Sequence, residues 1–187
     1  MNAARQQAIE TARQVLARNP VFLDTETTGL DQRAQIVEIA VIDSNGEVLS
    51  DKLVRPTVII PADVIRIHHI TNEMVADQKP WVAVWPEVRS VLFNRLVAIY
   101  NEEFDMRIMQ QTHRQSGLEW KERLQTICVM KLYAQFRGEW DPRRRSYRYF
   151  SLDDAGKQCG IPLPNSHRAA DDCQLTRALL QAMAEAN

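Results

Sequence analysis

Two acidic residues stand at the end of a segment that otherwise has the character of a core strand. In VFLDTETTGL, three apolar residues precede Asp24 and Glu26, which are separated by one threonine. Side chains two residues apart on a strand point to the same face of a sheet. Neighbouring carboxylates repel each other unless a cation lies between them, and their oxygens suit Mg²⁺ or Mn²⁺. A strand that ends in solvent at a turn is the alternative, and a D-x-E pattern alone favours it.

Two later segments place acids where α/β proteins commonly bind ligands. In YNEEFDMRIM, Asp105 follows a short apolar strand and opens a helix. The carboxyl ends of strands are the usual binding edge of an α/β sheet. In NSHRAADDCQLT, His167 precedes Asp171 and Asp172 at the start of the last predicted helix. These two segments shift the interpretation of the first acid pair toward a metal site.

The elements that position these residues follow from hydrophobic spacing and turn residues. Strands are predicted at 21–26, 36–42, 47–54 and 96–101, and helices at 4–18, 86–93, 104–115, 151–160 and 168–184. A further strand or helix start is expected near LQTICVMKLYAQF, and 139–150 is expected to be a loop. The Asn45-Gly46 pair predicts a hairpin, so the second and third strands are antiparallel. The order of elements predicts an α/β fold with a mixed β-sheet flanked by α-helices.

The composition is typical of one soluble domain. The chain has 187 residues, a net charge of −1 and no run of 18 apolar residues. This excludes a membrane-spanning helix and general coating of nucleic acid, but permits a local basic track. The three cysteines lack a C-x-x-C spacing and are expected to be reduced thiols of a cytoplasmic protein without a signal peptide. We expect residues 1–19 to form a helix that packs on a single domain formed by residues 20–187.

Taken together, DTETTGL, YNEEFD and HRAADD resemble the three motifs of the DnaQ-like 3′–5′ exonucleases of the DEDDh class. The motifs occur in the family's order and extend over most of the chain. The resemblance implies an RNase H-like fold, which agrees with the mixed sheet. It also implies two Mg²⁺ or Mn²⁺ ions and hydrolytic removal of nucleotides from single-stranded 3′ ends, here expected to be DNA.

The resemblance also implies roles for individual acids. Asp24 would bridge both ions, Glu26 and Asp172 would complete one, and Asp105 would support the other. The two ions would clamp the attacking and leaving oxygens of an in-line displacement. The family's third motif is a histidine followed five residues later by an aspartate, which selects Asp172. Asp171 is then interpreted as an acid that faces the helix dipole.

His167 is implied to be the general base of this reaction. An unperturbed imidazole has a pKa of about 6.5, so it can accept a proton from the attacking water near neutral pH. Five residues of α-helix rotate a side chain by about 140°, so His167 and Asp172 would not share a helix face. We therefore expect His167 in the loop or the first turn, with Asn165 or Ser166 near the cap. Tyr100 departs from the family, where many relatives have histidine.

Substrate contacts are predicted close to the first two motifs. Leu30 resembles the family's apolar residue that wedges against the terminal base, and a hydrophobic turn anchor is an equal alternative. Thr27 and Thr28 could offer hydroxyl or backbone N–H groups to the terminal 3′-OH, or could serve the turn alone. Asn101, directly before the helix of the second motif, is a further predicted contact.

An arginine- and tyrosine-rich segment offers a second candidate surface. DPRRRSYRYF contains Arg143, Arg144, Arg145 and Tyr147. Cations for phosphates and rings for bases are what a single-strand track uses, and a solvated loop is the equal alternative. Glu38 lies within the apolar IVEIAVI, where it either supports the site or reaches solvent.

Several functions remain open alongside the 3′–5′ exonuclease. One is an exoribonuclease or a nuclease of short oligonucleotides. Another, from a different class, is a catalytically idle nucleic-acid-binding module, against which the intact set of four acids and a histidine argues. A third is a subunit of a polymerase or repair complex. The partners are expected to be single-stranded DNA or RNA 3′ ends and no membrane, and a homodimer is also left open.

Overall fold

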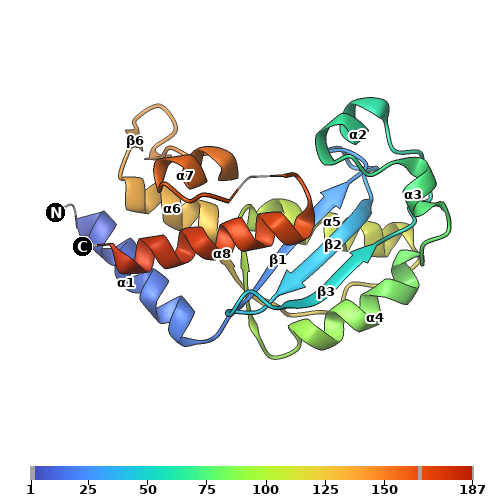
Figure 1. The fold of residues 1–187 in the computed structure, drawn as a ribbon, viewed down its shortest axis with the longest axis horizontal. Helices are drawn as coiled ribbons and strands as arrows, with labels where there is room; N and C mark the ends of the chain where they lie inside the picture. The colour runs from blue at the N-terminus through green and yellow to red at the C-terminus, as the bar shows by residue number, and fades with distance from the viewer. Residues whose placement is uncertain (1–2, 164–165, 187) are drawn as a thin grey trace.

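The computed structural model of the chain describes residues 3–163 and 166–186. It contains a five-stranded sheet of order β3-β2-β1-β4-β5 with helices on both faces (Figure 1). The strands are β1 (Val21–Thr27), β2 (Ile36–Ile42), β3 (Val48–Leu53), β4 (Leu96–Ile99) and β5 (Gln125–Cys128). β2 is antiparallel to β1 and β3, whereas β1, β4 and β5 are parallel. The predicted mixed sheet flanked by helices is confirmed.

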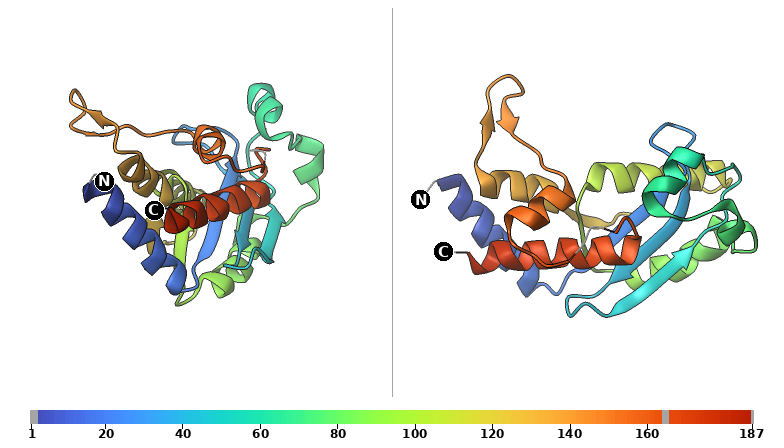
Figure 2. Two further views of the ribbon diagram at one scale, coloured as in Figure 1. Left: turned by 60° about the vertical axis from the view of Figure 1, so that its left-hand side comes forward. Right: turned by 45° about the horizontal axis from the view of Figure 1, so that its top comes forward.

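The two faces of the sheet are covered by different helices (Figure 2). One face packs against α1 (Ala3–Ala17), α6 (Val129–Arg137) and α8 (Ala169–Glu185). The other packs against α4 (Trp81–Leu92) and α5 (Glu102–Gln115). Phe22 belongs to the α8 side and Leu23 to the α5 side. Because strand side chains alternate, Asp24 and Glu26 lie on the same side as Phe22, beneath α8.

Short elements complete the chain. The helices α2 (Ala62–His68) and α3 (Asn72–Ala76) follow β3. The strands β6 (Trp140–Asp141) and β7 (Ser146–Tyr147) form a separate hairpin before α7 (Leu152–Gln158). The sequence analysis expected a plain loop where this hairpin occurs. Figure 2 shows the hairpin projecting from the α6 side of the molecule.

The predicted helix at 86–93 is wrong at its start. Helix α4 begins at Trp81, so Pro86 lies inside it rather than in its first turn. A proline within a helix costs about 3 kcal/mol because it removes a hydrogen bond and crowds the preceding turn. Pro86 is exposed, whereas the opposite stripe of the helix, which includes Trp81, Trp85 and Leu92, is buried. Burial of this stripe outweighs the local preference for a later start.

Local turn and capping predictions are confirmed where short-range rules suffice. The β2–β3 turn contains Gly46 in a left-handed conformation (φ 92°), and the Asp43 N–H donates to the Glu47 carbonyl at 2.9 Å. Ser151 Oγ accepts a hydrogen bond from the Asp154 N–H at 3.1 Å and so caps α7. The uncertain segment near LQTICVMKLYAQF divides into β5 and α6.

Helix α1 shares the core of the sheet's α8 side. Its buried residues, Ile9 among them, pack in the same cluster as residues of α6 and α8. Arg13 Nε donates to the Ala184 carbonyl at 2.8 Å, so α1 also binds the last turn of α8. The first and last helices therefore lie side by side (Figure 1). Within residues 3–163 and 166–186, no helix combines the length and apolarity needed to cross a membrane.

We expect Ile9→Ala to lower the free energy of unfolding by about 2–5 kcal/mol, the usual effect of such a truncation in a core. Urea unfolding followed by circular dichroism measures this change. The exposed Gln6 on the same helix supplies the control, since Gln6→Ala should change stability by no more than about 0.5 kcal/mol. Equal effects of the two substitutions would show that α1 does not share the cooperative core.

Candidate active site

Three carboxylates from two distant segments meet at the carboxyl end of β1. Asp24 and Glu26 lie on β1 and Asp172 lies in the first turn of α8, and ligand oxygens of all three are within 4.8 Å of one another. The Cys173 thiol packs this turn against the strands, with Sγ 3.5 Å from the Phe22 carbonyl oxygen. The third acid is therefore brought to the first two by a helix that crosses the sheet.

The fourth acid approaches from the neighbouring strand. Asp105 lies in the first turn of α5, directly after β4, which is parallel to β1. Thr25 Oγ1 donates to Asp105 Oδ1 at 2.7 Å. Asp105 is also the largest source of charge repulsion on Asp24. Thr25, between the two acids of the first motif, therefore has a role that the sequence analysis missed, although strand alternation already places it on the α5 side.

Burial and mutual repulsion strongly perturb the acids. Burial, then repulsion from Asp105 and the other carboxylates, raises the pKa of Asp24 well above its usual range. Burial, then repulsion from Asp172, raises the pKa of Glu26 to about 9. Burial raises the pKa of Asp105 to about 7, and the Thr25 hydroxyl partly offsets this. Burial raises the pKa of Asp172 to about 7 as well.

The cluster fits a hard divalent cation. Asp172 Oδ1 is buried, and among the described residues no group donates a hydrogen bond to it. A buried carboxylate oxygen without a donor is costly unless something else neutralises it. Because the converging ligands are all carboxylate oxygens, Mg²⁺ or Mn²⁺ matches them better than a metal that prefers nitrogen or sulfur. Asp24, Glu26 and Asp172 are the residues that would hold such an ion.

His167 lies in the loop immediately before α8, as its spacing from Asp172 led us to expect. Its side chain is exposed, and its backbone is left-handed with φ 52°. This conformation is uncommon for a non-glycine residue, although histidine adopts it more readily than most. The backbone N–H groups of Ser166 and His167 lower the pKa of Asp172, against the larger effect of its burial. The predicted base and the third acid are thus coupled through the backbone.

Of the two residues expected near the cap of α8, Ser166 lies close to it but is not the cap residue. The cap residue is Arg168, which makes no capping hydrogen bond with its own side chain, and Asn165 lies outside the described residues. The first helical N–H, that of Ala169, instead donates to Glu38 Oε2 at 2.8 Å. Ser166 Oγ donates to Asp171 Oδ2 at 2.6 Å, so Asp171 holds the preceding loop as well as facing the helix dipole.

The predicted contacts after β1 occupy two environments. Thr27 Oγ1 donates to the Gly29 carbonyl at 2.7 Å, and Thr28 Oγ1 accepts from the Gln35 N–H at 2.9 Å. Both hydroxyls therefore serve the turn. Leu30 is 77% exposed, which does not suit an anchor of that turn. It lines an open groove of about 550 Å³ between the β1–β2 loop and α2, together with Val58, Ile59, Pro61, Val64 and Ile67.

A buried histidine supports the end of β1. The Ile70 N–H donates to His68 Nδ1 at 3.0 Å, which places the ring proton on Nε2. His68 Nε2 lies 3.3 Å from the Thr27 carbonyl and therefore donates to it. Burial lowers the pKa of His68, so it remains neutral here. His68 is therefore a structural residue.

The residues before the second acid serve the fold. Asn101 is exposed and is the cap residue of α5, without a capping bond from its side chain. The Tyr100 hydroxyl donates to the carbonyls of Phe150 and Ser151, each at 3.1 Å. Tyr100 thus joins the end of β4 to the segment before α7. The tyrosine at this position, where many relatives have histidine, makes this contact.

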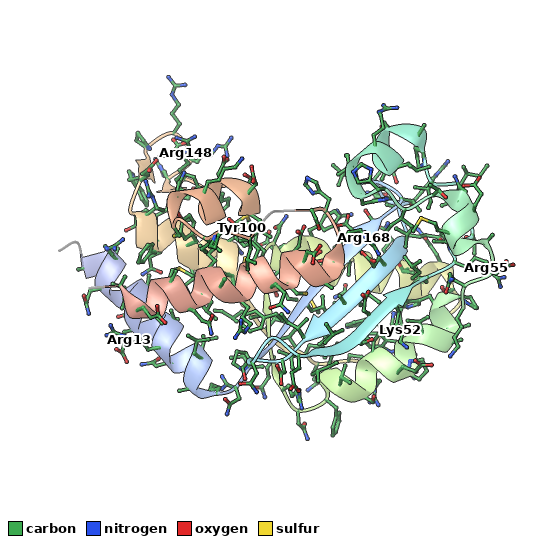
Figure 3. All side chains as sticks on the ribbon, in the orientation of Figure 1. Arg13, Lys52, Arg55, Tyr100, Arg148 and Arg168 are labelled. Carbon is green, nitrogen blue, oxygen red and sulfur yellow. The ribbon has the colours of Figure 1, made fainter. Side chains whose placement is uncertain are left out.

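The arginine- and tyrosine-rich segment is not gathered with the acids. Arg143, Arg144 and Arg145 are exposed in the turn of the β6–β7 hairpin, where Asp141 accepts hydrogen bonds from the first two backbone N–H groups. Tyr147 packs edge-on against Trp140. Figure 1 places this hairpin beside α6 and α7, whereas the acids lie under the start of α8. Arg148, which follows the hairpin (Figure 3), has Nη1 3.7 Å from Glu139 Oε2 and its guanidinium carbon 5.3 Å from the centre of the Phe150 ring.

Comparison with known proteins gives one consistent family. The exonuclease family profile matches residues 21–180. An uncharacterized exonuclease, CP81, of Escherichia phage 186 is 39% identical over 184 residues, which cover 94% of this chain and 93% of the phage protein. Exodeoxyribonuclease 10 of Escherichia coli K12 is 34% identical over 166 residues, 85% of this chain and 66% of that protein. Exonuclease X, solved in complex with 5′ overhanging duplex DNA, superposes with a TM-score of 0.63 at 30% identity, covering 87% of this chain and 90% of the other.

We expect the protein in EDTA to become less stable as the pH rises. The unfolded chain releases its carboxyl protons near pH 4, whereas the folded site retains protons up to about pH 7 to 9. In that interval the folded state binds more protons, so a higher pH favours unfolding. Melting temperatures in EDTA should fall between about pH 6 and 8.5, and Mn²⁺ should raise them most at the higher pH. A stabilisation by Mn²⁺ that does not grow with pH would contradict this account.

The adjacent acids of HRAADD provide a matched pair of variants for this measurement. Asp172→Asn removes one carboxylate of the cluster and should reduce the stabilisation by Mn²⁺ sharply. Asp171→Asn leaves the cluster intact and should retain that stabilisation, at a cost of about 0.3–1 kcal/mol of stability from the helix dipole. The opposite result would mean that Asp171, four residues after His167, is the metal ligand.

Proposed function

Because this chain belongs to the exonuclease family, we propose that it removes nucleotides from single-stranded 3′ ends of DNA by two-metal phosphodiester hydrolysis. The observation that carries the proposal is the convergence of Asp24, Glu26 and Asp172, with Asp105 beside Asp24. A module that only binds nucleic acid has no use for four clustered carboxylates, which would repel the phosphates. In this proposal residues 20–187 form the catalytic domain, on which the N-terminal helix packs.

Each acid has a position suited to its proposed role. When bound, two divalent ions would stabilise the attacking and leaving oxygens of an in-line displacement and acidify the attacking water. Asp24 lies among all the other acids and is the candidate bridge between the ions. Glu26 and Asp172 would complete one ion site, and Asp105, held by the Thr25 hydroxyl, would support the other. The strand and the two helices that carry these carboxylates hold them in place before the substrate arrives.

His167 is proposed to accept the proton of the attacking water. It precedes the helix that carries Asp172, and its exposed side chain is accessible to solvent and substrate. A base in a loop can approach the scissile phosphate from the solvent side while the acids remain fixed beneath it. This division separates proton transfer from charge stabilisation.

Substrate positioning is assigned to the surfaces beside the acids. The exposed Leu30 and the apolar groove next to it suit the face of the terminal base. The exposed Asn101, and the turn formed by Thr27 and Thr28, border the same end of the sheet. The hairpin arginines 143–145, with Tyr147, would meet phosphates and bases further along the strand. The relatives named for deoxyribonuclease activity and for a DNA complex support DNA over RNA.

The proposal is tested with 5′-labelled oligonucleotides of equal sequence: single-stranded DNA, single-stranded RNA, and a DNA duplex with a 5′ overhang. With Mg²⁺ or Mn²⁺ we expect single-stranded DNA to shorten stepwise from its 3′ end, and EDTA or Asp24→Asn to abolish the products. Faster cleavage of the RNA than of the single-stranded DNA would identify the protein as an exoribonuclease instead. Internal cuts, release of the 5′ label as a mononucleotide without shortened intermediates, or binding without cleavage would refute the proposal.

His167→Ala should reduce the single-turnover rate by about 10²–10⁴, the usual contribution of a positioned general base. Stabilisation by Mn²⁺ should be unchanged, because all four carboxylates remain.

A second histidine supplies a close control for this variant. His69 is also exposed and left-handed, with φ 61°, so His69→Ala makes the same backbone and side-chain change outside the acid cluster. It should leave the single-turnover rate intact. A His167→Ala enzyme as active as His69→Ala would exclude His167 as the base.

A further inference from the structure

Glu38 is a buried charge that the proposed chemistry does not use. It lies on β2 directly opposite Glu26 on β1, on the side of the sheet covered by α8, and is only 1% exposed. The possibility that it reaches solvent is therefore wrong. Both of its carboxylate oxygens accept hydrogen bonds from Arg168 Nε, at 3.0 and 3.1 Å, and Arg168 Nη2 donates to Oε1.

The same carboxylate also serves the start of helix α8. The Ala169 N–H, which has no partner within the helix, donates to Glu38 Oε2 at 2.8 Å. A carboxylate at this end of a helix is favoured by the free N–H groups and by the helix dipole. Glu38 therefore replaces the side-chain cap that Arg168, the cap residue, does not provide. The cap comes from the sheet, so it fixes the helix to β2 as well as ending it.

Both proposed functional residues of the third motif adjoin this contact. His167 immediately precedes Arg168, and the Asp172 N–H donates to the Arg168 carbonyl at 3.0 Å, one helical turn later. A displacement of Arg168 would therefore move the loop of the proposed base and the turn of the third acid together. Figure 3 shows Arg168 at the beginning of α8, above the sheet.

Charge balance explains why the contact involves an arginine. Glu38 repels Glu26 and Asp172, whereas Arg168 attracts Glu26. Arg168 also lies near Asp51 and Asp171, so it provides a positive charge within a strongly acidic surface. A guanidinium can bind both carboxylate oxygens in one plane, which an ammonium group cannot do, so it fixes orientation in addition to charge.

We propose that Glu38 and Arg168 are positioning residues that hold the His167 loop and Asp172 against the acids of β1. Their catalytic importance rests on the proposed function, whereas their effect on the start of α8 does not. Removing outer partners of metal ligands commonly costs 10–100-fold in metal affinity or activity. We expect a loss of this size for Arg168→Gln, seen in the Mn²⁺ concentration that gives half-maximal thermal stabilisation and in kcat, with little change in KM for DNA.

The experiment compares Arg168→Gln, Glu38→Gln and the double variant with Arg177→Gln. Arg177 is a matched control because it also anchors α8, through Nε to the Ser44 carbonyl at 2.8 Å, but lies further along the helix. Amide hydrogen exchange in EDTA should accelerate over 166–172 in the Arg168 and Glu38 variants and not in the control. Amide exchange over 166–172 in the double variant should be no faster than in the more severe single variant, because the two residues act through one contact.

The measurements distinguish a failure of the positioning role from a failure of the proposed function. Exchange and Mn²⁺ dependence equal to those of Arg177→Gln would overturn the positioning role. A raised KM with unchanged kcat would instead make Arg168 a direct phosphate contact and would also overturn it. If exchange changes while the wild-type protein cleaves no oligonucleotide, the proposed function fails and the structural role of the pair stands.

If Glu38→Gln does not fold, Arg168→Lys tests the positioning role instead. It keeps the charge and loses the paired hydrogen bonds, so its exchange and Mn²⁺ dependence should lie between those of the wild type and Arg168→Gln. Wild-type behaviour of Arg168→Lys would show that charge alone suffices, against the proposal.

Discussion

Repulsion between buried and half-buried carboxylates is the constraint around which this structure is organised. Asp24, Glu26, Asp105 and Asp172 each have a raised pKa, with burial as the largest cause, and repulsion among the carboxylates adds to it for the first two. Left to themselves, such groups would move apart into water. They stay together because each is carried by an element that other interactions hold in place. The site is therefore preformed at the expense of stability, which is typical of sites that bind cations.

Three kinds of restraint oppose the repulsion. Strand β1 is the middle strand of five: it pairs with β4 at Val21 and Phe22 and with β2 from Phe22 to Thr27, so β2 holds its carboxyl end. Helix α5 is tied to that strand by the Thr25 hydroxyl. Helix α8 is tied to it by the Cys173 thiol and to β2 by the Glu38 carboxylate. Thr25 projects to the α5 side and Glu38 to the α8 side, so the two faces of the sheet are both used. An intact core beneath each helix is what makes these restraints rigid.

The sequence was most informative where short-range rules apply. The Asn45-Gly46 turn, the Ser151 cap and the alternation of strands and helices were predicted correctly, and the motif spacing selected the acids that the fold brings together. The start of α4 was mistaken because burial of Trp81 and Trp85 overrides what Pro86 suggests locally. The cap of α8 was missed because its acceptor, Glu38, lies 131 residues away in the chain. No rule based on neighbours in sequence can find such a contact, since only the packing of α8 on β2 creates it.

The contrast between the buried acids and the exposed histidine follows from what each must do in the proposed reaction. Carboxylates that repel one another have to be held before the substrate arrives, because assembling them during the reaction would add to its barrier. A base that removes one proton has no such requirement and gains from access to solvent and substrate. Yet His167 is joined to Asp172 through a single short loop and the first turn of α8. The exposed base can therefore keep a fixed position relative to Asp172 only if the start of α8 is fixed. The contact between Glu38 and Arg168 lies at this start.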